Sequence, residues 1–174
     1  MSKTAEYIQK QLIKEFVAQG HSLTGAAEKS LRYEKQVTPN GFTITGYGKG
    51  FLRHIETGVK WQNIPFRQGS GAGKSDFIDG LRKYAELRFM LSGKKALGAA
   101  FAMAYKMKGR DGNPGEGMST KKAYKHSSTG ERHNFITIVL KRERNVIKQM
   151  VAQEMGTEIT GKIKNMFTKY TDKL

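Results

Sequence analysis

The sequence predicts an α+β fold, with helices packed on a small antiparallel sheet (hairpin at 33–46) and a long C-terminal helical segment. Three observations favour this class: one strong hairpin signal, several segments whose apolar residues recur every three or four positions, and a similar repeat that runs almost to the C-terminus. The length of 174 residues and the hydrophobic content of 37% suit a single domain with a modest core, which we expect to span 1–174.

The hairpin signal is the segment Thr38-Pro39-Asn40-Gly41. Asn-Gly supplies the positive φ angles that a tight two-residue turn requires, so 33–37 is expected to pair with 42–46. A short amphipathic helix follows from Phe51, and Gly58 stands where the C-cap of that helix belongs. A two-stranded ribbon is marginal alone, so helices are expected to cover it.

Four further helical segments follow from apolar spacing. The first covers 4–20, with Thr4 as its N-cap and Gly20 at its end, and a short second helix ends at Leu31. The other two cover 76–91 and 94–108. Because Ala, Gly and Met dominate 94–108, another backbone can approach it closely, and we expect this helix to be the most buried.

The C-terminal repeat runs from Phe135 to Tyr170 and is interrupted by Gly156. One long bent helix or two consecutive helices would fit this spacing. A strand remains an alternative for the start of the segment, because 135–140 is rich in β-branched residues.

The segment between the predicted helices at 51 and 76 begins with an apolar loop. Trp61, the only tryptophan, and Phe66 flank Pro65, and this composition is too apolar for a plain linker. The loop is therefore expected to contact the core or a neighbouring subunit, and the residues predicted for a subunit interface are Trp61, Ile64, Pro65 and Phe66. Flexible loops are predicted at 67–75 and 109–130, where Gly, Ser, Thr and Lys predominate.

The charge of the chain indicates acidic partners, with nucleic acid first. The formal net charge is +16, and residues 59–134 hold fifteen basic but only six acidic side chains. Any one of these basic side chains is most simply a solvated residue on a helix face, whereas the set as a whole favours an electrostatic role. The residues predicted to face phosphate in a DNA channel are Lys74, Arg82, Lys83, Lys94, Lys95, Lys121 and Lys122. Further candidates are Arg88, Lys106, Lys108, Arg110 and Lys125.

Several function classes find little support in the sequence. There is no cysteine, and the histidines lack metal-ligand spacing, so neither a disulfide framework nor a metal site is expected. The segment 69–75 resembles a phosphate-cradling loop, but Gln68 stands where the required glycine should be. We therefore expect no enzyme, no catalytic residues and no cofactor. With neither a signal peptide nor a membrane-spanning run, the chain is expected to be soluble and made in a cytoplasm.

The order of several short blocks resembles the neck and tail-completion proteins of tailed bacteriophages. These blocks are 20–31 (GHSLTGAAEKSL), 44–46 (ITG), 51–58 (FLRHIETG) and 64–66 (IPF). Later segments, at 100–108, 117–120 and 128–132, are similar to blocks found in phages of Bacteroidota hosts, including the crAss-like group. The resemblance covers 5–170 in outline, and the glycine-rich segment 68–74 has no counterpart in it.

The resemblance implies a structural role in the virion. Copies are expected to close into a homo-oligomeric ring with twelvefold symmetry. The ring is expected to contact the portal protein and adjacent neck or tail proteins. It would surround packaged double-stranded DNA without reading its sequence. It implies no catalytic residues, no membrane association, and synthesis in the host cytoplasm. Two alternatives stay open: a freestanding basic nucleic-acid-binding protein, and a phosphoryl-transfer enzyme that would depend on Lys74.

Overall fold

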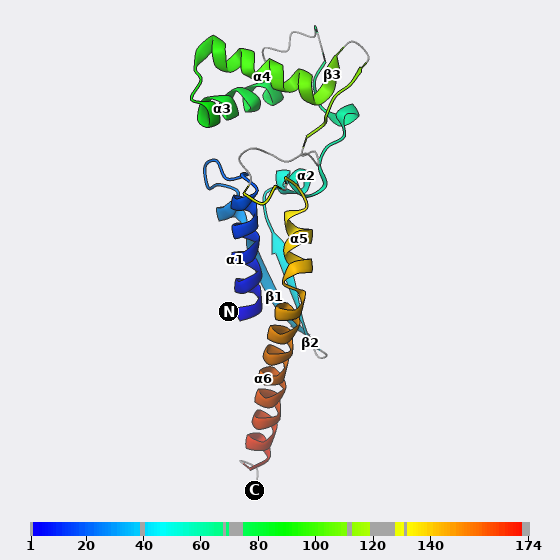
Figure 1. Ribbon diagram of the computed structural model, residues 1–174. Helices are drawn as coiled ribbons and strands as arrows, with labels where there is room; N and C mark the ends of the chain where they lie inside the picture. The colour runs from blue at the N-terminus through cyan, green and yellow to red at the C-terminus, as the bar shows by residue number, and fades with distance from the viewer. Residues whose placement is uncertain are drawn as a thin grey trace.

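The computed structural model describes residues 2–38, 41–67, 69, 75–110, 113–118, 128–130 and 132–171, with side chains up to Asn165. The fold is α+β, as predicted, with helices packed around a small antiparallel hairpin and a long helix at the C-terminal end. Figure 1 shows an elongated molecule in which α3, α4 and β3 lie at one end and α6 forms the other. The predicted residues Lys74, Lys121 and Lys122 lie outside the described residues.

The hairpin has the predicted register. Strand β1 (Arg32–Thr38) pairs antiparallel with β2 (Gly41–Tyr47), from Arg32 opposite Tyr47 to Thr38 opposite Gly41. Helix α1 (Lys3–Ala18) packs beside β1 and against α5 (Phe135–Arg142) and α6 (Arg144–Thr171). This arrangement supplies the helical cover that an isolated two-stranded ribbon lacks.

Several helix ends differ from the expectation. The N-cap of α1 is Ser2 rather than Thr4, because the Ser2 hydroxyl accepts a hydrogen bond from the Ala5 N–H at 3.2 Å. The short helix before Leu31 is a 3-10 turn, Glu28–Ser30. Helix α2 (Phe51–Thr57) ends as predicted at Gly58, whose φ of 72° is left-handed and whose N–H donates to the carbonyl of His54.

The C-terminal repeat forms two consecutive helices, which was one of the two arrangements expected, and the start of the repeat is helical rather than a strand. The break lies at Glu143, between α5 and α6, and α6 continues through Gly156 without interruption. At the tip of the hairpin, a Cβ on Gly41 would lie 3.7 Å from the Met155 side chain. The part of α6 after Met155 therefore extends about four turns past the hairpin.

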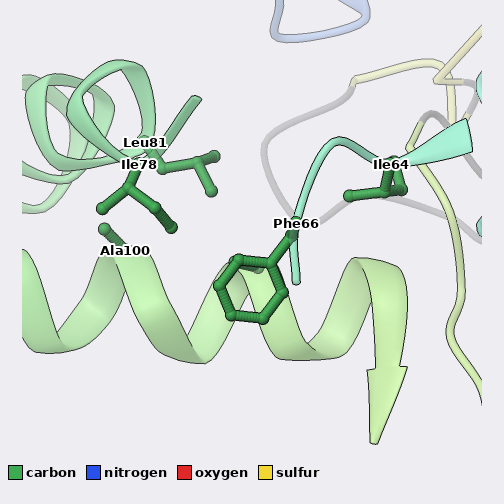
Figure 2. Close-up of a cluster of buried hydrophobic side chains, with 6 residues drawn as sticks. Ile64, Phe66, Ile78, Leu81 and Ala100 are labelled. Atoms are coloured by element: carbon green, nitrogen blue, oxygen red, sulfur yellow. The ribbon is translucent and has the colours of Figure 1, made fainter. Parts of the chain in front are cut away.

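The described residues form two hydrophobic clusters. One joins Phe16 of α1 to Phe135 of α5, with ring centroids 5.3 Å apart, and includes Leu52 and Ala27. The other lies between α3 (Asp76–Phe89) and α4 (Gly93–Lys108). Figure 2 shows Ile78, Leu81 and Ala100 together, with Phe66 beside α4 and Ile64 farther along that helix.

The stripe of alanines on α4 explains how closely α3 and α4 pack. Ala96, Ala100 and Ala104 have no exposed surface, and Ala100 and Ala104 contact the cluster that contains Ile78. The residues after α4 were predicted as a loop, but their described part contains a short hairpin of β3 (Gly109–Arg110) and β4 (Asn113–Pro114). Gly109 has a φ of 95° and lies so close to the Asn113 backbone that a side chain there would collide with it.

Candidate nucleic-acid interface

The described part of the predicted phosphate-facing set lies on α3 and α4. Arg82 and Lys83 are on the exposed side of α3, while Lys94 and Lys95 stand in the first turn of α4. The span of these two helices, 76–108, holds seven basic and three acidic side chains, so this end of the molecule keeps the positive surplus expected from the sequence.

Arg82 is less available than its neighbours. Its guanidinium lies 3.7 Å from a carboxylate oxygen of Asp79 and 3.7 Å from one of Glu86, on the same face of the helix. All three side chains are more than 40% exposed, so these ion pairs contribute little to stability. They do offset the charge of Arg82, which leaves Lys83 as the stronger candidate on α3.

Lys94 and Lys95 occupy the positive end of a helix dipole. Helix α4 begins with a glycine followed by these two lysines, its first turn holds no acidic residue, and its N-cap Ser92 makes no side-chain capping bond. Neither lysine forms an ion pair with any residue that the structure describes. Two cations at a helix N-terminus are unfavourable for the isolated fold, and a phosphate would remove that cost.

Lys108 and Arg88, two of the further basic candidates, donate hydrogen bonds to backbone carbonyls. The Lys108 Nζ donates to the carbonyls of Gln62 and Ile64, at 3.0 and 3.1 Å, and so fixes the loop that carries Phe66. Arg88 donates to the Gly20 carbonyl at 3.4 Å, which links α3 to the segment after α1. These hydrogen bonds stabilise the fold, so Lys108 and Arg88 have a structural role that does not depend on binding phosphate.

The apolar loop divides between the core and the surface. Ile64 and Phe66 are buried in the α3–α4 cluster of their own chain, where the Phe66 ring meets Tyr105 edge to face at 5.0 Å. Trp61 is half-buried and Pro65 is exposed. Of the four predicted interface residues, these two are the ones that a neighbouring subunit could reach.

The remaining polar side chains of note stabilise the fold. His21 is half-buried, and this burial lowers its pKa, while its Nε2 donates to the Arg132 carbonyl at 2.8 Å. Among the residues that the structure describes, no group of three or more His, Asp or Glu side chains could hold a metal ion. Most of the segment that resembles a phosphate-cradling loop, Gln68 and 70–74, lies outside the described residues.

Sequence reasoning missed the part that Glu56 plays. Its carboxylate accepts hydrogen bonds from the Ile136 N–H at 2.8 Å and the Thr137 N–H at 3.1 Å, and so caps α5 from a different helix. The N-cap position itself, Asn134, has a left-handed backbone and makes no side-chain capping bond. No local pattern reveals such a cap, because donor and acceptor lie about eighty residues apart.

Comparison of the chain with protein-family models, with curated proteins and with solved structures gives no significant match. None of the helices in the described ranges has both the length and the apolar character that crossing a lipid bilayer requires.

Proposed function

We infer that this chain is a virion structural protein of a tailed bacteriophage, whose copies form a ring in the neck or tail, connect the portal to the tail and surround the DNA channel. The proposal follows from the order of the sequence blocks and from one structural observation. Helix α6 runs about four turns past the hairpin and leaves Ile159 and Ile163 53% and 45% exposed. Apolar side chains on a projecting helix favour burial in an assembly.

The charge distribution also supports the proposal. Lys83, Lys94 and Lys95 face solvent without ion pairs to described residues, at the end of the molecule opposite α6. The electrostatic repulsion of a chain with a charge of +16 disfavours assembly unless a polyanion offsets it. Double-stranded DNA inside a ring supplies that polyanion and needs no base-specific contact.

The test of the ring is the assembly state of the purified chain with and without the projecting part of α6. We expect sedimentation and negative-stain images, taken with double-stranded DNA present to offset the charge, to show closed rings for the full chain. A chain truncated after Glu158, which keeps the ion pair between Glu158 and Lys35, should form a smaller species. Helical circular dichroism of the truncated chain checks that the remainder folds. A full chain that stays monomeric yet binds DNA in a salt-sensitive way would instead fit a freestanding nucleic-acid-binding protein.

The role of the basic surface is tested by DNA binding across salt concentrations. Replacing Lys83, Lys94 and Lys95 together by alanine should make the plot of log association constant against log salt concentration less steep. The magnitude of its negative slope should fall by about 0.9 for each phosphate that the variant no longer binds. The matched control replaces Lys10, Lys141 and Lys148, three exposed lysines on α1, α5 and α6, and so removes the same charge. An equal decrease of the slope in both variants would refute a localised interface.

A further inference from the structure

An apolar groove of about 610 Å³ opens between α1, the base of the hairpin, α2 and α5. Its walls rest on the cluster that contains Phe16, since Leu12, Leu31 and Ile136 all pack against that cluster. Leu140, on the wall formed by α5, is 44% exposed. Nothing among the described residues fills the groove, and its size lies in the range of sites that bind other molecules.

The rim of this groove carries positive charge. Arg32, Lys49 and Arg53 line it, and none of them forms an ion pair with a residue that the structure describes. The Arg32 guanidinium lies 5.4 Å from the centre of the Tyr47 ring, and this contact leaves its charge unneutralised. Among the described lining residues the one carboxylate is Glu56, whose oxygens are occupied by the backbone of α5.

We propose that this groove docks an acidic amphipathic segment of a neighbouring protein, with apolar side chains along one face and Asp or Glu beside them. The apolar walls suit the buried face of such a segment, as in other complexes where a helix lies in a groove. The three rim cations provide the complementary charge that orients it. The proposal deepens the proposed function by giving the chemistry of an adjacent virion protein, and rests on that function only for the identity of the neighbour as a virion component.

Charge selects this occupant over two others. A second copy would have to offer a segment of this chain, and its projecting end, 159–171, holds three basic side chains and no acidic side chain, so the rim cations repel it. A DNA duplex could meet the rim, but its phosphates cannot fill apolar walls. Only a segment that is both acidic and apolar satisfies the two parts of the groove.

The test uses yeast-displayed random peptides selected on the full chain, followed by fluorescence anisotropy of the recovered peptides. We expect the recovered peptides to combine large apolar residues with Asp and Glu. Arg53→Glu and Leu140→Asp should each weaken their binding about tenfold or more. Both residues are exposed, so these variants are expected to fold, and circular dichroism checks this. Lys10→Glu, an equal charge reversal on the exposed side of α1, should leave binding unchanged.

Four results would overturn the proposal. These are recovery of no peptide, recovery of peptides without acidic residues, equal weakening by Lys10→Glu and Arg53→Glu, and self-association of the chain that Leu140→Asp abolishes. The last result would assign the groove to a second copy. The ring is judged separately by sedimentation, because a monomer that binds the acidic peptides supports the groove and refutes the ring. A chain that forms rings but recovers no peptide supports the ring and refutes the groove as a docking site.

Discussion

A single carboxylate, Glu154, holds three separate parts of the chain together. One of its oxygens accepts from the Thr4 backbone N–H at 2.7 Å, the Ser2 hydroxyl donates to the carboxylate at 2.9 Å, and the Lys35 Nζ lies 3.3 Å away. Glu158, one turn later, also pairs with Lys35. These contacts fix the start of α1 and strand β1 to α6. We predict that Glu154→Gln weakens all three contacts and lowers the stability of the fold.

The magnitude follows from the ionisation of this group. Burial opposes the charge of Glu154, but the hydrogen bonds from Thr4 and Ser2, together with Lys35, outweigh it and lower its pKa from 4.5 to about 2. A shift of this size corresponds to at most about 3 kcal/mol of stability. The side chain is 16% exposed, and glutamine can still accept some of these bonds. We therefore expect Glu154→Gln to lower the free energy of unfolding by about 2 kcal/mol at pH 7.

The pH dependence has a definite sign. The pKa of Glu154 is lower in the folded state than the ordinary value of 4.5, so its contribution is complete above about pH 5.5 and is lost as pH falls towards 2. The difference in unfolding free energy between wild type and Glu154→Gln should shrink by about 1 to 2 kcal/mol between pH 7 and pH 3. Urea unfolding followed by helical circular dichroism at each pH measures this difference.

The control is Glu86→Gln, which removes an exposed carboxylate on α3 and should change stability by less than about 0.5 kcal/mol. A difference between wild type and Glu154→Gln that stays constant from pH 7 to pH 3 would refute the reasoning. It would mean that the ionised form of Glu154 contributes nothing that the amide does not supply.

Three further substitutions test the packing of the fold, each measured by urea unfolding. Glu56→Ala should cost about 1 to 2 kcal/mol, because it uncaps α5, and equal stability would show that water replaces the cap. Tyr33→Phe should leave stability unchanged or raise it by up to about 1 kcal/mol, because the Tyr33 hydroxyl is buried without a described partner. Ala100→Leu should cost about 1 to 3 kcal/mol, because α3 packs directly on this residue, whereas a neutral outcome would reveal unfilled space there.

Local signals in the sequence predicted most of the secondary structure. The Asn-Gly signal predicted the register of the hairpin, and the apolar repeats located α1, α3 and α4 to within a few residues. The break at Glu143 was not predicted, because the apolar repeat continues across it and no glycine or proline marks the end of a helix there. The helical start at Phe135 also overrides a β-branched run, since Phe135 and Val139 are both buried one turn apart on the same face.

Contacts between distant segments account for what the sequence did not reveal. The apolar groove forms where four elements meet, and its rim cations Arg32, Lys49 and Arg53 lie outside the stretch where basic residues are most concentrated. A count of charges along the chain therefore favoured the basic residues of 59–134 and gave no weight to these three. The carboxylates of Glu56 and Glu154 likewise have partners that are remote in sequence, so their neighbours along the chain carry no signal of either role.

Two lysines on α4 show that the position of a basic residue in the fold, more than the number of basic residues nearby, determines whether it is a candidate for binding phosphate. Lys108, in the last turn, donates to two carbonyls of the loop that carries Phe66, and its charge also suits the negative end of the helix dipole. Lys94, in the first turn, meets the positive end of that dipole and has no ion pair with a described residue. The first placement stabilises the isolated fold and the second opposes it. A lysine that costs stability in the isolated chain is the better candidate for a bound phosphate, because binding removes the cost.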